Sequence, residues 1–269
     1  MENVTLRRLP LLLLPFALAA CASNPATTPP ETAGAARRAP ATGQELLEQM
    51  HATYSSTWYR TLTFVQRTSF PSRPAETWYE AGSIPGKLRI DIAPLDSMNA
   101  TMYVGDSAYT FRRGRLANAR KDRNLLMTLG FDVYAQPPAT TAAQVREQGV
   151  DLARIHQGTW QGRPVWIVGA AAGDTTSSQF WVDAERMLFV RLLQKLPGQN
   201  NQTAMLDVEF NKYQRLGGGW IAPEVIIRVN GREVMREEYS DMRADVELPA
   251  DLYTTTEYRR PGWVDPSIR

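Results

Sequence analysis

The segment Pro85-Gly86-Lys87-Leu88-Arg89-Ile90-Asp91-Ile92 joins a turn signal to a strict alternation of polar and apolar residues. Proline and glycine favour a reversal of the chain direction. The alternation that follows has a period of two, which is typical of a β-strand with one apolar and one more polar face. This segment therefore predicts a strand that starts at a tight turn.

The same alternation recurs along most of the chain. In Leu62 to Arg67, Leu62, Phe64 and Gln66 alternate with Thr63, Val65 and Arg67, and Ala204 to Asn211 places apolar side chains at every second position. Turn signals separate such runs, and Asn230-Gly231 predicts a type I′ hairpin because both residues tolerate a positive φ. The connections are short, so we expect about eleven antiparallel strands in meander order.

Some predicted strands are apolar on both faces. Val165 to Val168, Leu188 to Leu193 and Val225 to Val229 consist almost entirely of apolar residues. A sheet with only one covered face would leave half of these side chains in water. Either a second layer covers the other face, or the sheet curls around something apolar.

Helices are predicted at two places. Thr42 can cap a helix whose apolar residues recur at helical spacing as far as Tyr54. Asp122 or Asn124 can cap a second, strongly apolar helix, which Pro137-Pro138 is expected to end. Both helices have an apolar side that must be buried against the sheet.

A shorter third helix is predicted from Thr141 to Gln148. Two or three helices could plug a curled sheet but could not cover both faces of an open one. The expected fold is α+β and mainly β: a curved antiparallel half-barrel with the helices plugging its concave side.

The start of the chain has the order of a secretory signal. Arg7 and Arg8 precede the apolar run Leu9 to Leu18, which is shorter than the roughly 20 residues of a membrane span. Leu18-Ala19-Ala20-Cys21 resembles the bacterial lipobox, whose cysteine receives a diacylglyceryl group and, after cleavage, an N-acyl group. We predict a signal peptide over residues 1–20 and lipid attachment at Cys21. The alternative is an ordinary signal followed by an unrelated cysteine.

Composition divides the rest of the chain. Residues 21–42 are rich in Ala, Pro, Thr and Gly with little to bury, which predicts a disordered tether. We expect the folded domain over residues 43–258 and a C-terminal tail over residues 259–269. Ala22 stands where an Asp retains enteric lipoproteins at the inner membrane. The expected location is therefore the periplasmic face of the outer membrane, with the membrane as a partner through the anchor.

Charge and motifs argue against several function classes. The formal net charge of the 269 residues is +2, which gives no reason to expect nucleic-acid binding. A lone cysteine excludes an intrachain disulfide or a cysteine metal cluster. His51 and His156 belong to different predicted elements and begin no metal-binding motif. Gly105-Asp106-Ser107 is a hairpin turn rather than a nucleophile elbow, and Gly217 to Gly219 precede a strand, unlike a phosphate loop. We expect neither catalysis nor a metal or free cofactor.

Several short motifs follow one another in a fixed order over roughly residues 44–258. They are the first helix after the lipobox, Phe64-Val65-Gln66, Gly82-Ser83-Ile84-Pro85-Gly86-Lys87-Leu88-Arg89-Ile90, the hairpin from Asn99 to Phe111, the helix from Leu125 to Gly130, and Leu248-Pro249. This order resembles the outer-membrane lipoprotein-sorting superfamily, the LolA/LolB-like carriers.

The resemblance implies an incomplete barrel, closed by helices, whose apolar interior takes acyl chains of lipoproteins or lipids. Strand phase shows which residues share a face but not which face lines a cavity, so we take the more regular apolar face. The candidate cavity residues are Phe64, Leu88, Ile90, Val190, Leu206, Phe210 and Ile227. The soluble carriers place an arginine before the proline of the Gly-to-Pro motif, where it helps to hold a lid helix. Ile84 stands at that position here.

The densest run of positive charge gives one more candidate contact. Arg112, Arg113 and Arg115 either form a solvated hairpin end or contact anionic headgroups near the cavity mouth. We therefore expect a lipid-anchored periplasmic protein that binds acyl chains for sorting or transfer at the outer membrane. The alternative is a regulatory or envelope-assembly lipoprotein that uses the same fold to bind a periplasmic protein.

Overall fold

A computed structural model of the chain describes residues 38–197 and 203–264. The predicted signal peptide, Cys21 and most of the predicted tether lie outside these residues. The described residues from Pro40 onward belong to one compact unit. None of the described helices is both long and apolar enough to cross a membrane.

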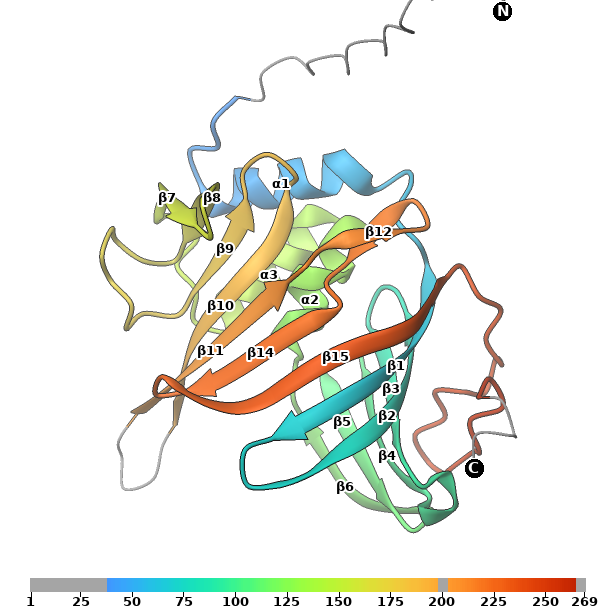
Figure 1. The fold of residues 1–269 in the computed structure, drawn as a ribbon. Helices are drawn as coiled ribbons and strands as arrows, with labels where there is room; N and C mark the ends of the chain where they lie inside the picture. The colour runs from blue at the N-terminus through green and yellow to red at the C-terminus, as the bar shows by residue number, and fades with distance from the viewer. Residues whose placement is uncertain (1–37, 198–202, 265–269) are drawn as a thin grey trace, which may run out of the picture. The chain divides into compact units, whose positions relative to one another are not determined.

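One sheet of 13 antiparallel strands dominates the structure (Figure 1). In spatial order its strands are β6 (Arg115–Lys121), β5 (Ser107–Arg112), β4 (Asn99–Val104), β3 (Lys87–Ile92), β2 (Arg73–Ser83), β1 (Thr61–Phe70), β15 (Arg232–Ala244), β14 (Glu224–Val229), β11 (Thr203–Asn211), β10 (Leu188–Pro197), β9 (Gln179–Asp183), β8 (Arg163–Val168) and β7 (Ile155–Trp160). The sheet is curved but not closed, because the edge strands β6 and β7 do not pair with each other. The predicted half-barrel is confirmed.

The described residues form 15 strands, whereas about eleven were expected. Thirteen belong to the large sheet, and β12 (Gln214–Leu216) and β13 (Gly219–Ile221) make a separate hairpin. β6 gives no sequence signal because every one of its residues is exposed. It is a strand only because it pairs with β5. The meander order holds in two runs, β1 to β6 and β7 to β11, which β14 and β15 join.

The helices lie on the concave side of the sheet, with α2 and α3 behind β10, β11 and β14 in Figure 1. They are α1 (Gly43–Tyr54), α2 (Leu125–Gly130) and α3 (Pro138–Glu147), with short 3₁₀ turns η1 (Leu95–Ser97) and η2 (Asp132–Tyr134). α2, η2 and α3 form the connection from edge strand β6 to edge strand β7. The chain must therefore cross the concave side between the two open edges.

Local sequence signals explain where these helices begin. The Thr42 hydroxyl accepts a hydrogen bond from the Glu45 N–H at 3.1 Å, and Asn124 caps α2 in the same way. Two expectations are wrong. α2 ends at Gly130, and Pro138 starts α3 instead of stopping a helix, because proline suits a first helical turn whose N–H groups have no intrahelical partner.

The predicted turn at Asn230-Gly231 is confirmed. These two residues join β14 to β15, and their φ values of 50° and 77° are the positive values that a type I′ turn requires. The hairpin sets the register that brings Val229 opposite Arg232 and Arg228 opposite Glu233, and an irregularity between Arg228 and Ile227 shifts the pairing beyond it.

The main core lies between the concave face and the helices. Leu46, Leu47 and Met50 of α1 and Leu129 of α2 are fully buried against sheet residues such as Val208. Apolar side chains at i, i+1 and i+4 of α1 form one stripe, as the helical spacing predicted.

The convex face of β1 to β5 is covered by the C-terminal segment, residues 247–264. Alternation in β3 suggested that Arg89 and Asp91 face water, yet both side chains are fully buried. Arg89 Nε and Nη2 donate to the two Asp91 carboxylate oxygens at 2.7 and 2.8 Å.

Two backbone carbonyls of the C-terminal segment complete this buried ion pair. Arg89 also donates to the carbonyl oxygens of Leu252, at 2.9 Å, and of Arg259. The Tyr258 hydroxyl lies 3.3 Å from the Asp91 carboxylate. The polar face of β3 is therefore the buried one, because an otherwise irregular segment is fastened to it. Residues 259–264 of the predicted tail belong to this covering segment.

Replacing Arg89 with Met keeps most of the side-chain volume but leaves Asp91 buried without its cation. We expect Arg89→Met to lower the free energy of unfolding by about 3–5 kcal/mol and to make the C-terminal segment accessible to proteases. Urea unfolding and limited proteolysis measure the two effects.

Arg67 provides the control, because its ion pair with Glu238 is exposed, with 63% and 50% of the two side chains accessible. Arg67→Met should change stability by no more than about 1 kcal/mol. Equal losses in the two variants would show that the buried pair has no special role.

Candidate functional site

The concave face of β1 to β4 and β15, which we name the hollow, is less covered than the rest of the concave face. Phe64 lies opposite Glu80, Glu80 opposite Ile90, and Ile90 opposite Thr101. Directly opposed residues share a face, so this row runs across the hollow. The Phe64 ring packs on Tyr239 of β15, with 4.4 Å between ring centroids. Leu88 and Ile90 are only half-buried, so the hollow presents apolar side chains that no helix fully covers.

α2 borders one end of the hollow. A pocket of about 20 Å³ lies between this helix and β1 to β3, which is room for about one water molecule. It is lined by Leu62, Phe64, Gly82, Ile84, Lys87, Leu88, Met127 and Phe131. An acyl chain could extend beyond Leu88 towards the core only if Met127 and Phe131 moved.

The turn before β3 contacts the segment that follows α2. The Gly86 N–H donates to Asp132 Oδ1 at 2.9 Å, and Ile84 is buried in the main core. Asp132 is 5% exposed. Burial raises the pKa of its carboxyl group to about 6, although the Gly86 N–H and the positive charge of Arg123 both lower it.

Two acidic side chains lie in the hollow on either side of β1. Glu80 is on β2 and Glu237 on β15, where Glu237 pairs with Thr68 of β1. The Tyr239 hydroxyl donates to Glu237 Oε2 at 2.7 Å. Burial raises the pKa of Glu237 to about 7, and burial together with the charge of Glu237 raises that of Glu80 well above its ordinary value.

Solved structures share this architecture, whereas no protein-family model matches the sequence and a search of curated proteins finds no significant match. A domain from Vibrio parahaemolyticus named for outer membrane lipoprotein sorting is 10% identical with a TM-score of 0.52, covering 79% of this chain and 96% of that one. A DUF1329 family protein from Desulfovibrio piger is 12% identical with a TM-score of 0.50, covering 78% and 95%.

The chain has the fold of the outer membrane lipoprotein-sorting protein domain. A LolA superfamily protein from Nitrosomonas europaea is also similar, at 13% identity and a TM-score of 0.46 over 80% of this chain and 98% of that one. The assignment depends on the two higher-scoring structures and concerns the fold alone. The fold that the resemblance of the short motifs implied is thereby confirmed.

At the turn before β3 the contact is apolar where the resemblance implied an arginine. Ile84 packs in the core beside the pocket formed with Met127 and Phe131. The Gly86–Asp132 hydrogen bond is a polar link between the same turn and the segment that follows α2. The turn therefore holds this region through packing and one buried carboxyl group.

The seven candidate cavity residues divide into three groups. Leu88 and Ile90 lie in the hollow, and Leu206 of β11 is also partly exposed at the edge of the core. Phe64, Phe210 and Ile227 are on the concave face but buried in the main core.

Val190 is on the other side of the sheet. It packs with Val165 and Ile167 in a separate cluster, beneath Trp160 and Trp181. An irregularity in the β9–β10 pairing between Phe189 and Arg191 reverses its phase. Alternation alone predicts that Val190 shares a face with Leu188 and Leu192. In the structure Val190 does not lie on the face of the other six candidate residues.

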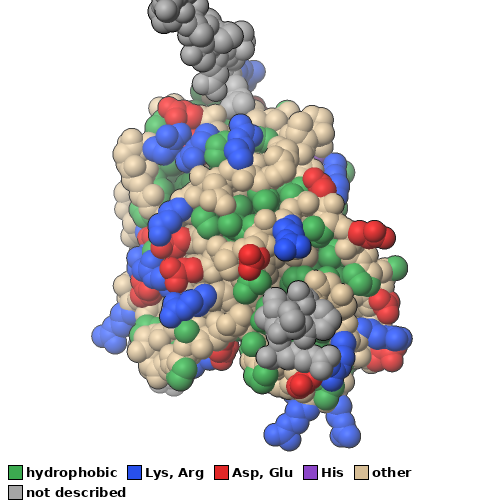
Figure 2. All heavy atoms as spheres, turned by 45° about the vertical axis from the view of Figure 1, so that its right-hand side comes forward, with side chains coloured by type: hydrophobic (Ala, Val, Ile, Leu, Met, Phe, Trp, Pro, Cys, Tyr) green, Lys and Arg blue, Asp and Glu red, His purple; other side chains and the backbone are tan. Residues whose placement is uncertain are grey.

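The three candidate arginines form an exposed tip between β5 and β6. Arg112, Arg113 and Arg115 are all exposed and make no ion pair with another described residue. Two further cations at the other end of β6 are paired: Lys121 Nζ lies 2.6 Å from Glu147 at the end of α3, and Arg120 bonds Asp122. On the face shown in Figure 2 acidic and basic side chains are interspersed, as expected for a nearly neutral chain.

Sequence reasoning missed Glu80, Glu237 and Tyr239. Glu80 follows Trp78 and Tyr79 in a strand without regular alternation, and Glu237 lies within a charged run. The sequence offers one signal for Glu80. The turn at Gly86 fixes the register between β2 and β3, and in this register Glu80 lies on the same face as the apolar residues of β3.

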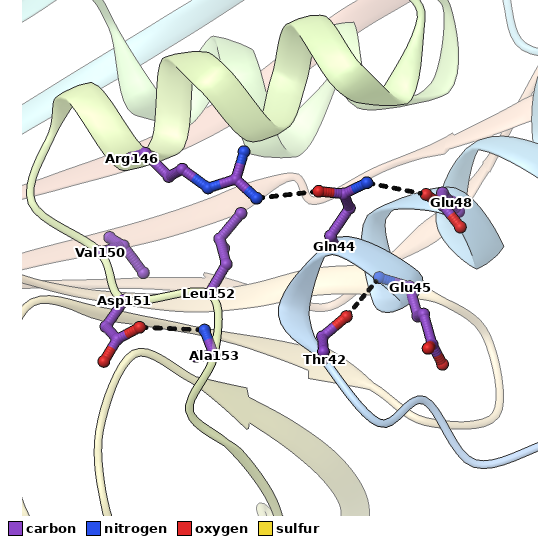
Figure 3. Close-up of a pocket in the computed structure, with 9 residues that line it drawn as sticks. All are labelled: Thr42, Gln44, Glu45, Glu48, Arg146, Val150, Asp151, Leu152 and Ala153. Atoms are coloured by element: carbon purple, nitrogen blue, oxygen red, sulfur yellow. Dashed lines mark hydrogen bonds between the residues drawn. The ribbon is translucent and has the colours of Figure 1, made fainter.

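A larger depression of about 580 Å³ lies between α1 and the segment after α3 (Figure 3). Its polar groups bond to one another: Arg146 donates to Gln44 at 2.8 Å, and Gln44 donates to Glu48 at 3.2 Å. Because these groups satisfy each other, the depression offers no converging set of free ligands.

The two histidines contact different backbone carbonyl groups. His51 lies against the Val133 carbonyl oxygen at 3.2 Å, and His156 against that of Gln157 at 3.0 Å. Among the described residues no group of three or more His, Cys, Asp or Glu side chains could hold a metal ion.

The buried carboxyl group of Asp132 predicts a pH-dependent stability. Its folded pKa of about 6 exceeds the ordinary value of 3.8, so the unfolded chain loses this proton first. The stability contribution of this group therefore falls as pH rises from about 4 to 6, by up to about 3 kcal/mol. Asp132→Asn keeps the acceptor for Gly86 without a charge, and should exceed the wild type in stability by up to this amount above pH 6.

Urea unfolding over a pH series measures the difference. It should vanish below about pH 4, where the carboxyl group is protonated in both states. Asp122→Asn is the control, since Asp122 is a surface partner of Arg120. A difference between Asp132→Asn and the wild type that does not change with pH would contradict the interpretation.

Proposed function

We propose that this protein binds an acyl chain of a lipid or lipoprotein in the hollow, without catalysing a reaction. The observation that carries the proposal is the half-buried pair Leu88 and Ile90 on the concave face of a sheet whose remaining concave residues are largely buried. Apolar side chains left partly accessible inside a curved sheet lower the free energy of an apolar ligand by removing it from water.

The energy available is adequate for a carrier. Each methylene group moved from water into an apolar site contributes about 0.8 kcal/mol. The pocket beside α2 is too small for a chain, so full insertion requires Met127 and Phe131 to move away from β1 to β3. α2 has only 6 residues, and a helix this short has little stability apart from its packing.

The named role of one solved relative supports the same proposal. The Vibrio parahaemolyticus domain with this fold carries a name that refers to outer membrane lipoprotein sorting. We extend the proposal to a chain anchored through lipid on Cys21 at the periplasmic face of the outer membrane. The anchor follows from the lipobox, because Cys21 lies outside the described residues.

Native mass spectrometry of gently purified protein tests the proposal. We expect a bound lipid to be retained, whereas a stoichiometric protein partner with an empty hollow would favour the assembly role. The double variant Leu88→Gln with Ile90→Gln should bind a fluorescent fatty alcohol, whose end group is uncharged, at least about tenfold more weakly, since it loses roughly 1.4 kcal/mol or more of apolar contact.

Leu116→Gln is the matched control for this pair. Leu116 is a large apolar residue on the edge strand β6 and is 44% exposed. Its partner Phe111 packs on Tyr258 of the C-terminal segment, so Leu116 is away from the hollow. Equal weakening by the control and the double variant would argue against binding at Leu88 and Ile90.

We propose further that the arginine tip contacts anionic headgroups. Each basic residue near an anionic surface contributes about 1 kcal/mol. The measurement uses the Cys21→Ser chain, which lacks the attachment site and is expected to leave the membrane fraction. Changing Arg112, Arg113 and Arg115 to Gln should abolish most of its salt-sensitive binding to anionic liposomes, with an unchanged circular dichroism spectrum.

Arg67→Gln, Arg73→Gln and Arg232→Gln together provide a control with the same loss of charge. These three arginines lie at or near the ends of β1, β2 and β15 rather than on the β5–β6 tip. An unaltered salt-dependent binding curve in the tip variant, or the same loss in both variants, would exclude a specific role for the tip.

A further inference from the structure

The two carboxyl groups of the hollow have no counterion among the described residues. Glu80 is 4% exposed, and its side chain makes no hydrogen bond or ion pair with any residue in the described part of the chain. Glu237 receives a hydrogen bond from Tyr239, but no described lysine or arginine pairs with it. Buried charges in proteins are ordinarily paired, so two buried acids without a cation require an explanation.

A structural role would require partners that Glu80 lacks. A protonated buried carboxylic acid stabilises a fold by donating a hydrogen bond, and Glu80 donates none within residues 38–197 and 203–264. A metal site is also unsupported there, because no described group of three ligating side chains exists. Leucine or glutamine at this position would cost less free energy.

The position of the acids relative to the apolar surface indicates what they could contact. Glu80 lies directly opposite Ile90, and Leu88 is the next residue on the same face of β3. Glu237 and Tyr239 are only partly buried, so the hollow reaches them from solvent. An elongated ligand lying along Leu88 and Ile90 would therefore bring one of its ends to Glu80.

We propose that the hollow selects an amphiphile with a positively charged amine at the end of its apolar chain, and that Glu80 and Glu237 contact this ammonium group. This inference rests on the proposed acyl-chain binding at Leu88 and Ile90 and adds the chemistry of the polar end. An ammonium group supplies the opposite charge that the protein does not provide, and favours the ionised form of both acids. An anionic end group would meet like charges in a low-dielectric site and be rejected.

Titration calorimetry with three probes of equal chain length tests the proposal: decylammonium and decanoate below their micelle concentrations, and decanol below its solubility limit. Wild-type protein should bind decylammonium at least about tenfold more tightly than decanoate, with decanol between them. Glu80→Gln, and more fully Glu80→Gln with Glu237→Gln, should reduce this preference to less than about threefold while leaving decanol affinity unchanged.

Glu238→Gln is the matched control. Glu238 neighbours Glu237 in β15 but is exposed and pairs with Arg67 at 3.1 Å. It should keep the full preference, so an equal effect of this variant would reduce the preference to overall charge and overturn the inference. Glutamine at positions 80 and 237 removes a buried charge without changing volume, so the variants should be no less stable than the wild type, which thermal unfolding checks.

The outcomes separate the two proposals. If decanoate binds as well as decylammonium, or if Glu80→Gln leaves the preference intact, the amine selectivity is wrong while chain binding stands. If none of the three probes binds, the acyl-chain proposal fails and the amine selectivity fails with it.

Discussion

Two edge strands that do not pair with each other determine how this molecule is built. β6 and β7 are the ends of a curved sheet of 13 strands, and the chain between them must cross the concave side. That connection contains α2, η2 and α3, which together with α1 fill the concave face over β8 to β14. These helices are too short to cover the whole concave face of the sheet. The part over β1 to β4 is left as a hollow with half-buried apolar residues.

The C-terminal segment decides which side of β3 remains accessible. Two of its backbone carbonyl groups accept hydrogen bonds from Arg89, and the segment thereby buries the polar convex face of β3. The apolar residues Leu88 and Ile90 lie on the other, less covered face. This arrangement inverts the usual relation between alternation and solvent, in which the apolar set is the covered one. A strand with ordinary amphipathic periodicity thereby keeps its apolar side chains partly accessible.

Much of the fold could be predicted because it depends on short-range signals. Thr42 specified a helix start and Asn230-Gly231 a hairpin, and alternation located most strands. Period two shows which side chains share a face, but coverage is decided by segments distant in sequence. The alternation in β3 therefore does not reveal that Arg89 and Asp91 are buried, and a pairing irregularity places Val190 with Val165 and Ile167 on the other face of the sheet. β6 could not be predicted, because a strand exposed on both faces has no alternation of polar and apolar residues.

The candidate site was harder to predict than the fold, and the reason is energetic. Core positions favour apolar residues, so the apolar pattern of a sequence predicts which residues are buried. Glu80 is an exception, because it lies where stability alone would favour an apolar side chain. Residues that lower stability without a local compensation are found where a fold has been adapted to a ligand. Glu80 and Asp132 are both buried acids beside the same half-covered surface, one in the hollow and one in the segment that follows α2. Their cost is tolerable because the Arg89–Asp91 pair and the helical core hold the rest of the sheet, so the hollow can keep two acids without a described counterion while the surrounding half-barrel remains folded.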